Sequence, residues 1–125
     1  MVPPRPSPPT PLTARRYERG RYQVLELSGE GDLATGETLR TEIDQALSQR
    51  PPALIVDLTR VSFCDGHCAR LILRAARHSP VVTVGLAGAA ALVFELLDPA
   101  GRLPRHPCVD DAVSALSELP SRQLS

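Results

Sequence analysis

The most informative stretch of the chain is Ala53-Leu-Ile-Val-Asp-Leu-Thr-Arg-Val-Ser-Phe-Cys-Asp65. Its first six residues form a nearly continuous apolar run, which is typical of a β-strand buried on both faces. Asp65, at the other end, has a short acidic side chain of the kind that caps a helix start. Apolar residues with helical spacing follow at Ala69, Leu73 and Ala76. The stretch therefore predicts a buried strand, a connecting loop and a helix that ends near Arg77.

The residues before this stretch predict one more strand and one more helix. The segment from Tyr22 to Ser28 is expected to be a strand, and Gly29-Glu-Gly-Asp32 interrupts it. Thr35 is placed to cap the next helix, which Pro51-Pro52 ends. Apolar residues repeat along one face of that helix at Leu39, Ile43 and Leu47.

The residues after the central stretch continue the same alternation. Residues 80–86 are expected to be a buried strand, and residues 89–97 a third helix. A short edge strand is expected at 103–106, and Asp110 is expected to cap a last helix. This order predicts an α/β domain with a mixed or mostly parallel β-sheet of four to five strands, flanked by about four helices.

Composition excludes several classes of function. The chain has 125 residues and a mass of 13.5 kDa, which suits one domain. All 14 basic residues are arginine and are balanced by 14 acidic residues, so no surplus positive charge is available for general nucleic-acid binding. Without lysine there is no Schiff base and no P-loop lysine. Only two tyrosines, two phenylalanines and no tryptophan are present, so we expect no stacking platform for bases.

The expected environment is the cytoplasm. The longest mostly apolar segment, residues 80–97, is interrupted by polar and small residues and predicts no membrane insertion. The N-terminus lacks the hydrophobic core of an export signal. Three cysteines in a chain without such a signal indicate reduced thiols in a cytoplasmic protein.

Proline and charge divide the chain into an arm and a domain. Six of the 13 prolines lie in residues 1–13, which are predicted to be a disordered arm or a proline-rich ligand. The folded domain is predicted over residues 14–120, with a tail at 121–125. Residues 1–21 carry five arginines and one glutamate, whereas residues 22–125 carry nine arginines and 13 acidic residues. The predicted domain is therefore mildly acidic.

Several of these segments together resemble the STAS domain, the fold of bacterial anti-sigma factor antagonists. The matching segments are Val24–Asp32, Leu54–Asp65, Ala91–Asp98 with Gly101, and Val109–Leu116. Their order and spacing match the family over roughly residues 20 to 118. The resemblance implies a STAS-like (SpoIIAA-like) α/β fold. It also implies a transcription regulator, without catalysis or a cofactor, that binds an anti-sigma factor of the histidine-kinase-like ATPase type.

The resemblance also implies a switch that this chain alters. In the family, the loop after the central strand normally reads Asp-Ser-Ser-Gly, and its first serine accepts a phosphate that blocks docking. A phosphate adds about −1.5 to −2 units of charge at such an interface. Here Asp65 is kept, the phosphoacceptor position is Gly66, and Cys68 replaces the family's glycine. The implied partner-binding surface comprises Asp32, Asp65, Gly66, His67, Cys68 and Arg70.

Three alternatives follow from the missing serine. The protein binds its anti-sigma factor permanently and is controlled by its abundance, or it is a degenerate relative that pairs with a different partner. The second case includes an accessory subunit of a stressosome or transporter-ATPase assembly. The third alternative is a substitute acceptor at Thr59 or Ser62, on the expected loop leading to Asp65. Threonine and serine in such loops also satisfy local backbone groups, which is the role we favour for both residues.

Two further clusters have both a chemical and a structural interpretation. Cysteine and histidine side chains that could serve a zinc or redox sensor occur at Cys64, His67, Cys68, His106 and Cys108. Their spacing matches no common zinc site, so we predict no metal and favour buried packing for the thiols near residue 66. The carboxylates Asp32, Asp57 and Asp65 would suit a phosphate-receiver site, but such a site needs a lysine.

A row of arginines is predicted on the helix that follows Asp65. Arg70, Arg74 and Arg77 fall at positions i, i+4 and i+7, so they share one helical face. The row is either a solvated face or a cationic strip that docks an acidic partner surface.

Overall fold

The computed structural model describes residues 11–31 and 36–118, which contain one five-stranded sheet in the order β1-β2-β3-β4-β5. The hairpin β1 (Thr13–Arg19) and β2 (Tyr22–Gly31) is antiparallel. β3 (Leu54–Cys64), β4 (Val81–Val84) and β5 (Arg105–His106) follow in parallel, each beside its predecessor. The mixed sheet agrees with the predicted α/β class.

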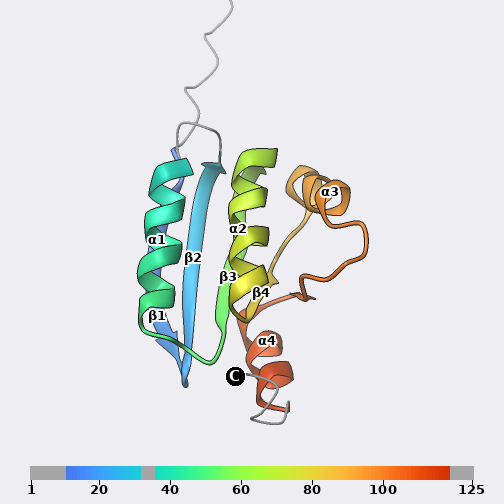
Figure 1. Cartoon of the computed structure of the whole chain (residues 1–125). Helices are drawn as coiled ribbons and strands as arrows, with labels where there is room; N and C mark the ends of the chain where they lie inside the picture. The colour runs from blue at the N-terminus through green and yellow to red at the C-terminus, as the bar shows by residue number, and fades with distance from the viewer. Residues whose placement is uncertain (1–10, 32–35, 119–125) are drawn as a thin grey trace, which may run out of the picture.

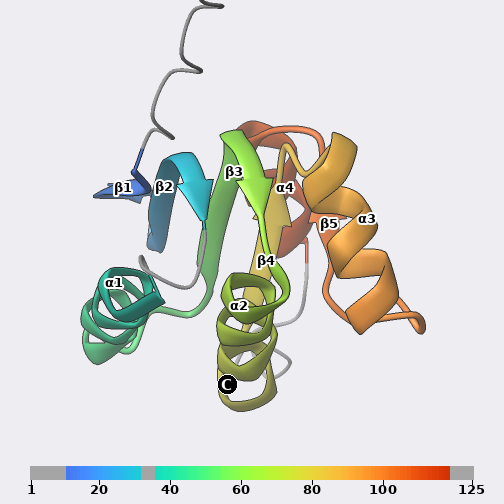
Figure 2. The same ribbon diagram turned by 90° about the horizontal axis from the view of Figure 1, so that it is seen from above.

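Four helices pack around this sheet, and they are divided unequally between its two faces (Figure 1). They are α1 (Gly36–Ser48), α2 (Gly66–His78), α3 (Gly88–Leu97) and α4 (Val109–Ser117). α1 and α2 lie against one face, whereas α4 lies on the opposite face, as Figure 2 shows. Within the described ranges, no helix combines the length and apolar character needed to cross a membrane.

The alternation of side chains along β3 divides the core between the two faces. Leu54, Val56 and Leu58 point into the larger cluster, which α1, α2 and α3 cover. Ile55 points into the smaller cluster, where α4 contributes Ala112 and Leu116. The apolar run at 54–58 is buried because both faces are covered at this level, as the sequence predicted.

The hairpin at the start of the fold corrects the predicted arm. Leu12 is buried in the larger core cluster and β1 begins at Thr13, so both residues belong to the folded domain although they were assigned to the arm. The strand Thr13-Ala-Arg-Arg-Tyr-Glu-Arg19 has no alternating apolar pattern. Its pairing with β2 through the Gly20 turn stabilises it, and such pairing is invisible in its own composition. Residues 1–10, residues 32–35 with the expected cap Thr35, and residues 119–125 lie outside the described residues.

Three other expectations are wrong in detail. β2 continues through Gly29 to Gly31, where the sequence predicted an interruption of the strand. β3 continues to Cys64, so Thr59 and Ser62 lie on a strand and not on a loop. The apolar run ends at Leu58, but backbone pairing with the end of β2 continues as far as Gly31. The last helix is capped at Cys108, without a side-chain hydrogen bond, and not at Asp110.

Candidate functional site

The candidate site is the start of α2, immediately after the buried strand β3. Asp65 is the N-cap residue, and its Oδ1 accepts a hydrogen bond from the backbone N–H of Cys68 at 3.0 Å. Arg77 and His78 occupy the last turn, where positive charge complements the helix dipole. The helix start that carries the predicted partner surface is therefore firmly held by local hydrogen bonding.

Cys64 and Cys68 lie beneath this helix start and are both buried. The Cys64 thiol donates to the carbonyl of Asp65 at 3.8 Å, and hydrogen bonding with Cys68, together with burial, raises the pKa of Cys64 above its usual range. A thiol that stays protonated at neutral pH is a poor nucleophile and a poor metal ligand. The geometry therefore favours a packing role and disfavours a thiol sensor at this pair.

Gly66 is the first residue of α2 and has room for a side chain. A Cβ atom placed on it meets no other atom within 4 Å, and its φ lies outside the left-handed region. A serine at this position would fit without displacing a neighbour. The phosphoacceptor side chain is therefore missing from a position that has space for it.

His67, the next residue, joins the starts of two helices. Its imidazole packs against Gly36, the first residue of α1, so closely that a Cβ on Gly36 would lie 2.6 Å from His67 Cδ2 and closer still to Nε2. Sequence reasoning did not include Gly36 in the site. The available signal was a glycine directly after the expected cap Thr35, where a better helix former is usual.

Replacing Asp65 with alanine is expected to lower the free energy of unfolding by about 1 kcal/mol, because the Cys68 amide loses its acceptor. Urea unfolding measures this change, and amide hydrogen exchange at Cys68 should become faster. Asp65→Asn, which keeps an acceptor oxygen, is the matched control and should lose only a few tenths of a kcal/mol. Equal losses in the two variants would contradict the capping role.

Replacing Gly36 with alanine is expected to have opposite effects in two backgrounds. In the wild type the new methyl group displaces His67, at a cost of about 1–3 kcal/mol. In a His67→Ala background the same change should be neutral or stabilising by up to about 1 kcal/mol, because alanine loses less backbone freedom than glycine on folding. Thermal unfolding of the wild type, the two single variants and the double variant measures this double-mutant cycle. The same destabilisation in both backgrounds would show that the two residues do not interact.

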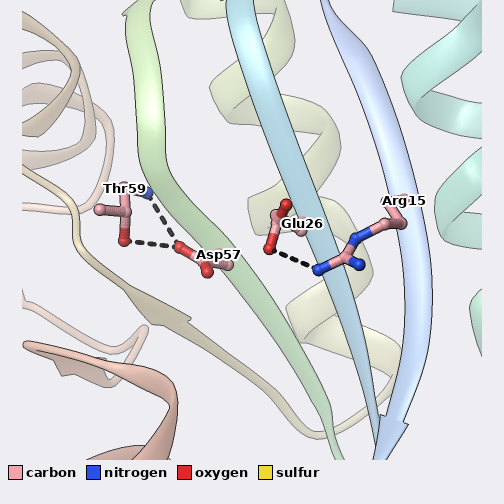
Figure 3. A network of polar contacts seen from close by, with 4 residues as sticks. All are labelled: Arg15, Glu26, Asp57 and Thr59. Atoms are coloured by element: carbon pink, nitrogen blue, oxygen red, sulfur yellow. Dashed lines mark hydrogen bonds and ion pairs between the residues drawn. The ribbon is translucent and has the colours of Figure 1, made fainter.

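The candidate acceptor Thr59 lies on the other face of the sheet from α2, in a polar network with Arg15, Glu26 and Asp57 (Figure 3). Asp57 Oδ1 accepts from the Thr59 N–H at 3.0 Å and from the Thr59 hydroxyl at 2.6 Å. Glu26 is the register partner of Asp57 and pairs with Arg15 at 3.2 Å. The nearby ring of Tyr17 has a raised pKa, because of burial and then of these two carboxylates. Thr59 is exposed, but its hydroxyl is held by Asp57 and it lies on the face of the sheet opposite to α2.

The remaining predicted residues are only partly brought together. The exposed Ser62 donates its hydroxyl hydrogen bond to the carbonyl of Gly29 at 3.3 Å, which ties β3 to the end of β2. Arg70 is exposed one turn into α2, and Asp32 lies outside the described residues. Phe63, which the sequence did not mark, is an exposed aromatic side chain two residues before Asp65. Among residues 11–31 and 36–118, no three His, Cys, Asp or Glu side chains form a group able to hold a metal.

Comparison with known proteins shows the family of the chain. The family model described as "Mlab, STAS domain" matches residues 15–102, which is more than half of the chain. The chain belongs to the STAS domain family. Proteins of this family are generally non-enzymatic regulators. No curated protein matches the chain in sequence.

Solved structures of STAS proteins share the fold. An anti-sigma factor antagonist from Mycobacterium paratuberculosis is 23% identical, with a TM-score of 0.80 over 86% of this chain and 95% of that one. Unphosphorylated SpoIIAA, an anti-sigma factor antagonist, is 20% identical, with a TM-score of 0.69 over 86% and 99% of the two chains. An anti-sigma factor antagonist (STAS) domain protein from Planctomyces limnophilus is 16% identical, with a TM-score of 0.68 over 82% and 96%. The STAS fold of this chain is therefore like that of anti-sigma factor antagonists.

Proposed function

We propose that this STAS protein acts in the bacterial cytoplasm as a regulator that binds a kinase-type anti-sigma factor and lacks the usual serine switch. The observation that carries the proposal is at Gly66, the first residue of α2. The cap at Asp65 is retained and the position has room for a side chain, but it offers no hydroxyl. The fold shared with solved antagonists supports this interpretation.

The proposed mechanism is competitive sequestration without catalysis by this chain. The start of α2 would dock on the anti-sigma factor and release its sigma factor. In a switched relative, a phosphate would place about −1.5 to −2 units of charge in that interface. Gly66 has no oxygen to accept the phosphate, so docking here would be controlled by the amount of protein.

The test is phosphate transfer in the presence of an ATPase-type anti-sigma factor. Wild-type protein is expected to bind the anti-sigma factor in a pull-down and to gain no phosphate from ATP. Gly66→Ser is expected to bind, to accept phosphate and then to release the partner. Gly66→Ala is the matched control, because it adds a side chain without the hydroxyl and should behave like the wild type.

Phosphate on the wild-type protein would overturn the claim that the switch is missing. Mass spectrometry would locate it, and Thr59→Ala and Ser62→Ala would separate the two candidate acceptors. Both hydroxyls already donate hydrogen bonds inside the sheet, to Asp57 and to Gly29, which is why we expect neither to react.

An accessory subunit of a stressosome or transporter-ATPase assembly is the second candidate function. The missing hydroxyl at Gly66 also favours this role, because a permanently assembled subunit needs no serine switch. Failure to bind any ATPase-type anti-sigma factor, together with stable co-purification with such an assembly, would replace the first proposal by this one.

A further inference from the structure

A second surface, away from Gly66, has the features of a binding site. A groove of about 820 Å³ lies between α2 and the segment that runs from the end of α3 toward β5. A pocket of this volume falls within the range of sites that bind small ligands. We call it the arginine groove, after its lining residues Arg70, Arg74, Arg77 and Arg102.

The arginine groove concentrates positive charge on an otherwise acidic part of the chain. Residues 22–125 contain nine arginines against 13 acidic residues, yet four of those nine line this groove. Within the described part of the chain, none of the four lies within 4.0 Å of a carboxylate, whereas Arg15, Arg16, Arg19 and Arg105 each form an ion pair. The groove therefore holds unneutralised guanidinium groups that suit carboxylate or phosphate.

The one acidic residue that lines the groove accepts hydrogen bonds from the backbone of its own loop. Asp98 accepts hydrogen bonds from the backbone N–H of Leu103 at 3.0 Å and of Arg102 at 3.1 Å. These bonds, with the Leu103 bond strongest, lower the pKa of Asp98 despite partial burial. The carboxylate thus shapes the wall opposite α2. Its negative charge acts on Arg102, so it offsets one of the four positive charges and leaves the row on α2 in excess.

The spacing of the arginines selects an extended ligand with several charges. Arg70, Arg74 and Arg77 are spread over about 10 Å of the axis of α2, because an α-helix rises 1.5 Å per residue. One carboxylate or one phosphate does not span that length. In an extended peptide, side chains on the same side repeat at about 7 Å, close to the roughly 6 Å between Arg70 and Arg74.

The uncharged residues that line the groove favour an acidic peptide over a nucleic acid. Leu73, Leu97 and Leu103 also line the groove, so apolar side chains accompany the charges, which suits a chain that alternates acidic and apolar side chains. None of the groove's described lining residues is aromatic, so bases have nothing to stack on. The acidic balance of residues 22–125 also disfavours long nucleic acids.

From these observations we propose that the arginine groove docks an acidic peptide segment of a partner protein, in which carboxylate and apolar side chains alternate. The proposal goes beyond the function proposed above. It shares Arg70 with the implied partner-binding surface, but it otherwise uses the side of α2 and the α3–β5 loop in place of the helix start at Gly66.

Fluorescence anisotropy with a labelled peptide of alternating glutamate and leucine tests the proposal on the full chain. We expect saturable binding that weakens as salt is raised, and at least about tenfold weaker binding of the same peptide with glutamine for glutamate. The variant Arg74→Gln/Arg77→Gln should bind at least about tenfold more weakly than the wild type. Arg102→Gln removes a charge from the opposite wall, outside any helix, and should weaken binding even if the α2 variant folds poorly.

The matched control is Arg50→Gln/Arg60→Gln, which removes the same charge from exposed positions that do not line the groove. It should bind within about twofold of the wild type, since distant surface charges contribute little. Equal weakening by the groove and control variants would overturn the proposal, and so would equal binding of the glutamine peptide. Tighter binding of oligothymidylate or ATP than of the acidic peptide would also overturn it and assign the groove to phosphates.

Discussion

Gly85→Ala is expected to lower the free energy of unfolding by about 2–5 kcal/mol, through left-handed backbone strain and steric overlap. Gly85 follows β4 with a φ of 69° and packs against Thr59. A Cβ would overlap Thr59 Oγ1 and lie only 2.8 Å from Thr59 Cα. Rotation of the threonine side chain moves its hydroxyl but not its Cα, so β3 itself would have to shift. Gly85 cannot simply retreat, because its N–H donates to the carbonyl of His106 at 3.0 Å.

Gly101→Ala is the matched control for this prediction. Gly101 has a φ of 64°, but a Cβ there meets no atom within 4 Å. Only the backbone cost of about 1–2 kcal/mol is expected at this position. Urea unfolding followed by circular dichroism measures both variants. If the two losses were equal, the close approach of Gly85 to Thr59 would contribute nothing to stability.

Phe94→Ala is expected to cost about 3–5 kcal/mol of unfolding free energy, because it removes a large, fully buried ring and leaves a cavity. Phe94 projects from α3 into the larger core cluster, where α3 packs against β3. Domains of this size have only about 5–15 kcal/mol of stability in total. The variant should therefore unfold at a markedly lower urea concentration and temperature.

Leu96→Ala on the same helix is the control. Its side chain is 80% exposed, whereas Phe94 is 0% exposed, so its loss should change stability by no more than about 0.5 kcal/mol. Both variants introduce alanine into α3 at nearly the same position, so Leu96→Ala also controls for the change in helix propensity. A large loss in Leu96→Ala, or a small one in Phe94→Ala, would mean that α3 packs on the sheet through a different face.

The start of α2 and the arginine groove are two proposed sites that use mostly different residues of the same helix. The first uses the cap, Gly66 and His67, and the second uses the side that carries Arg74 and Arg77. Variants at Gly66 should therefore leave peptide binding in the groove unchanged. The arginine variants should in turn leave phosphate transfer to Gly66→Ser intact, so failure of one proposal would be distinguishable from failure of the other.

Features whose causes are local were predictable before the structure was known. The strand at 54–58 was predicted from its continuous apolar run, and the start of α2 from Asp65, whose partner Cys68 lies three residues away. The arginine row on α2 follows from helical spacing in the same way. The candidate site could be located at Gly66 for this reason, although its role depended on a family resemblance.

Features that depend on contacts between residues far apart in the sequence could not be predicted from local patterns. β1 has no apolar alternation and exists as a strand because β2 pairs with it. Thr59 and Ser62 lie on a strand because β2 continues beside them beyond the apolar run. The contact of Gly36 with His67, the contact of Gly85 with Thr59 and the wall that Arg102 adds to the groove all join segments more than 20 residues apart. The amino-acid sequence by itself determined the buried part of β3, the cap at Asp65 and the helical periodicity of α2, whose causes are short-range, whereas packing between remote elements decided β1, the groove and the crowded glycines.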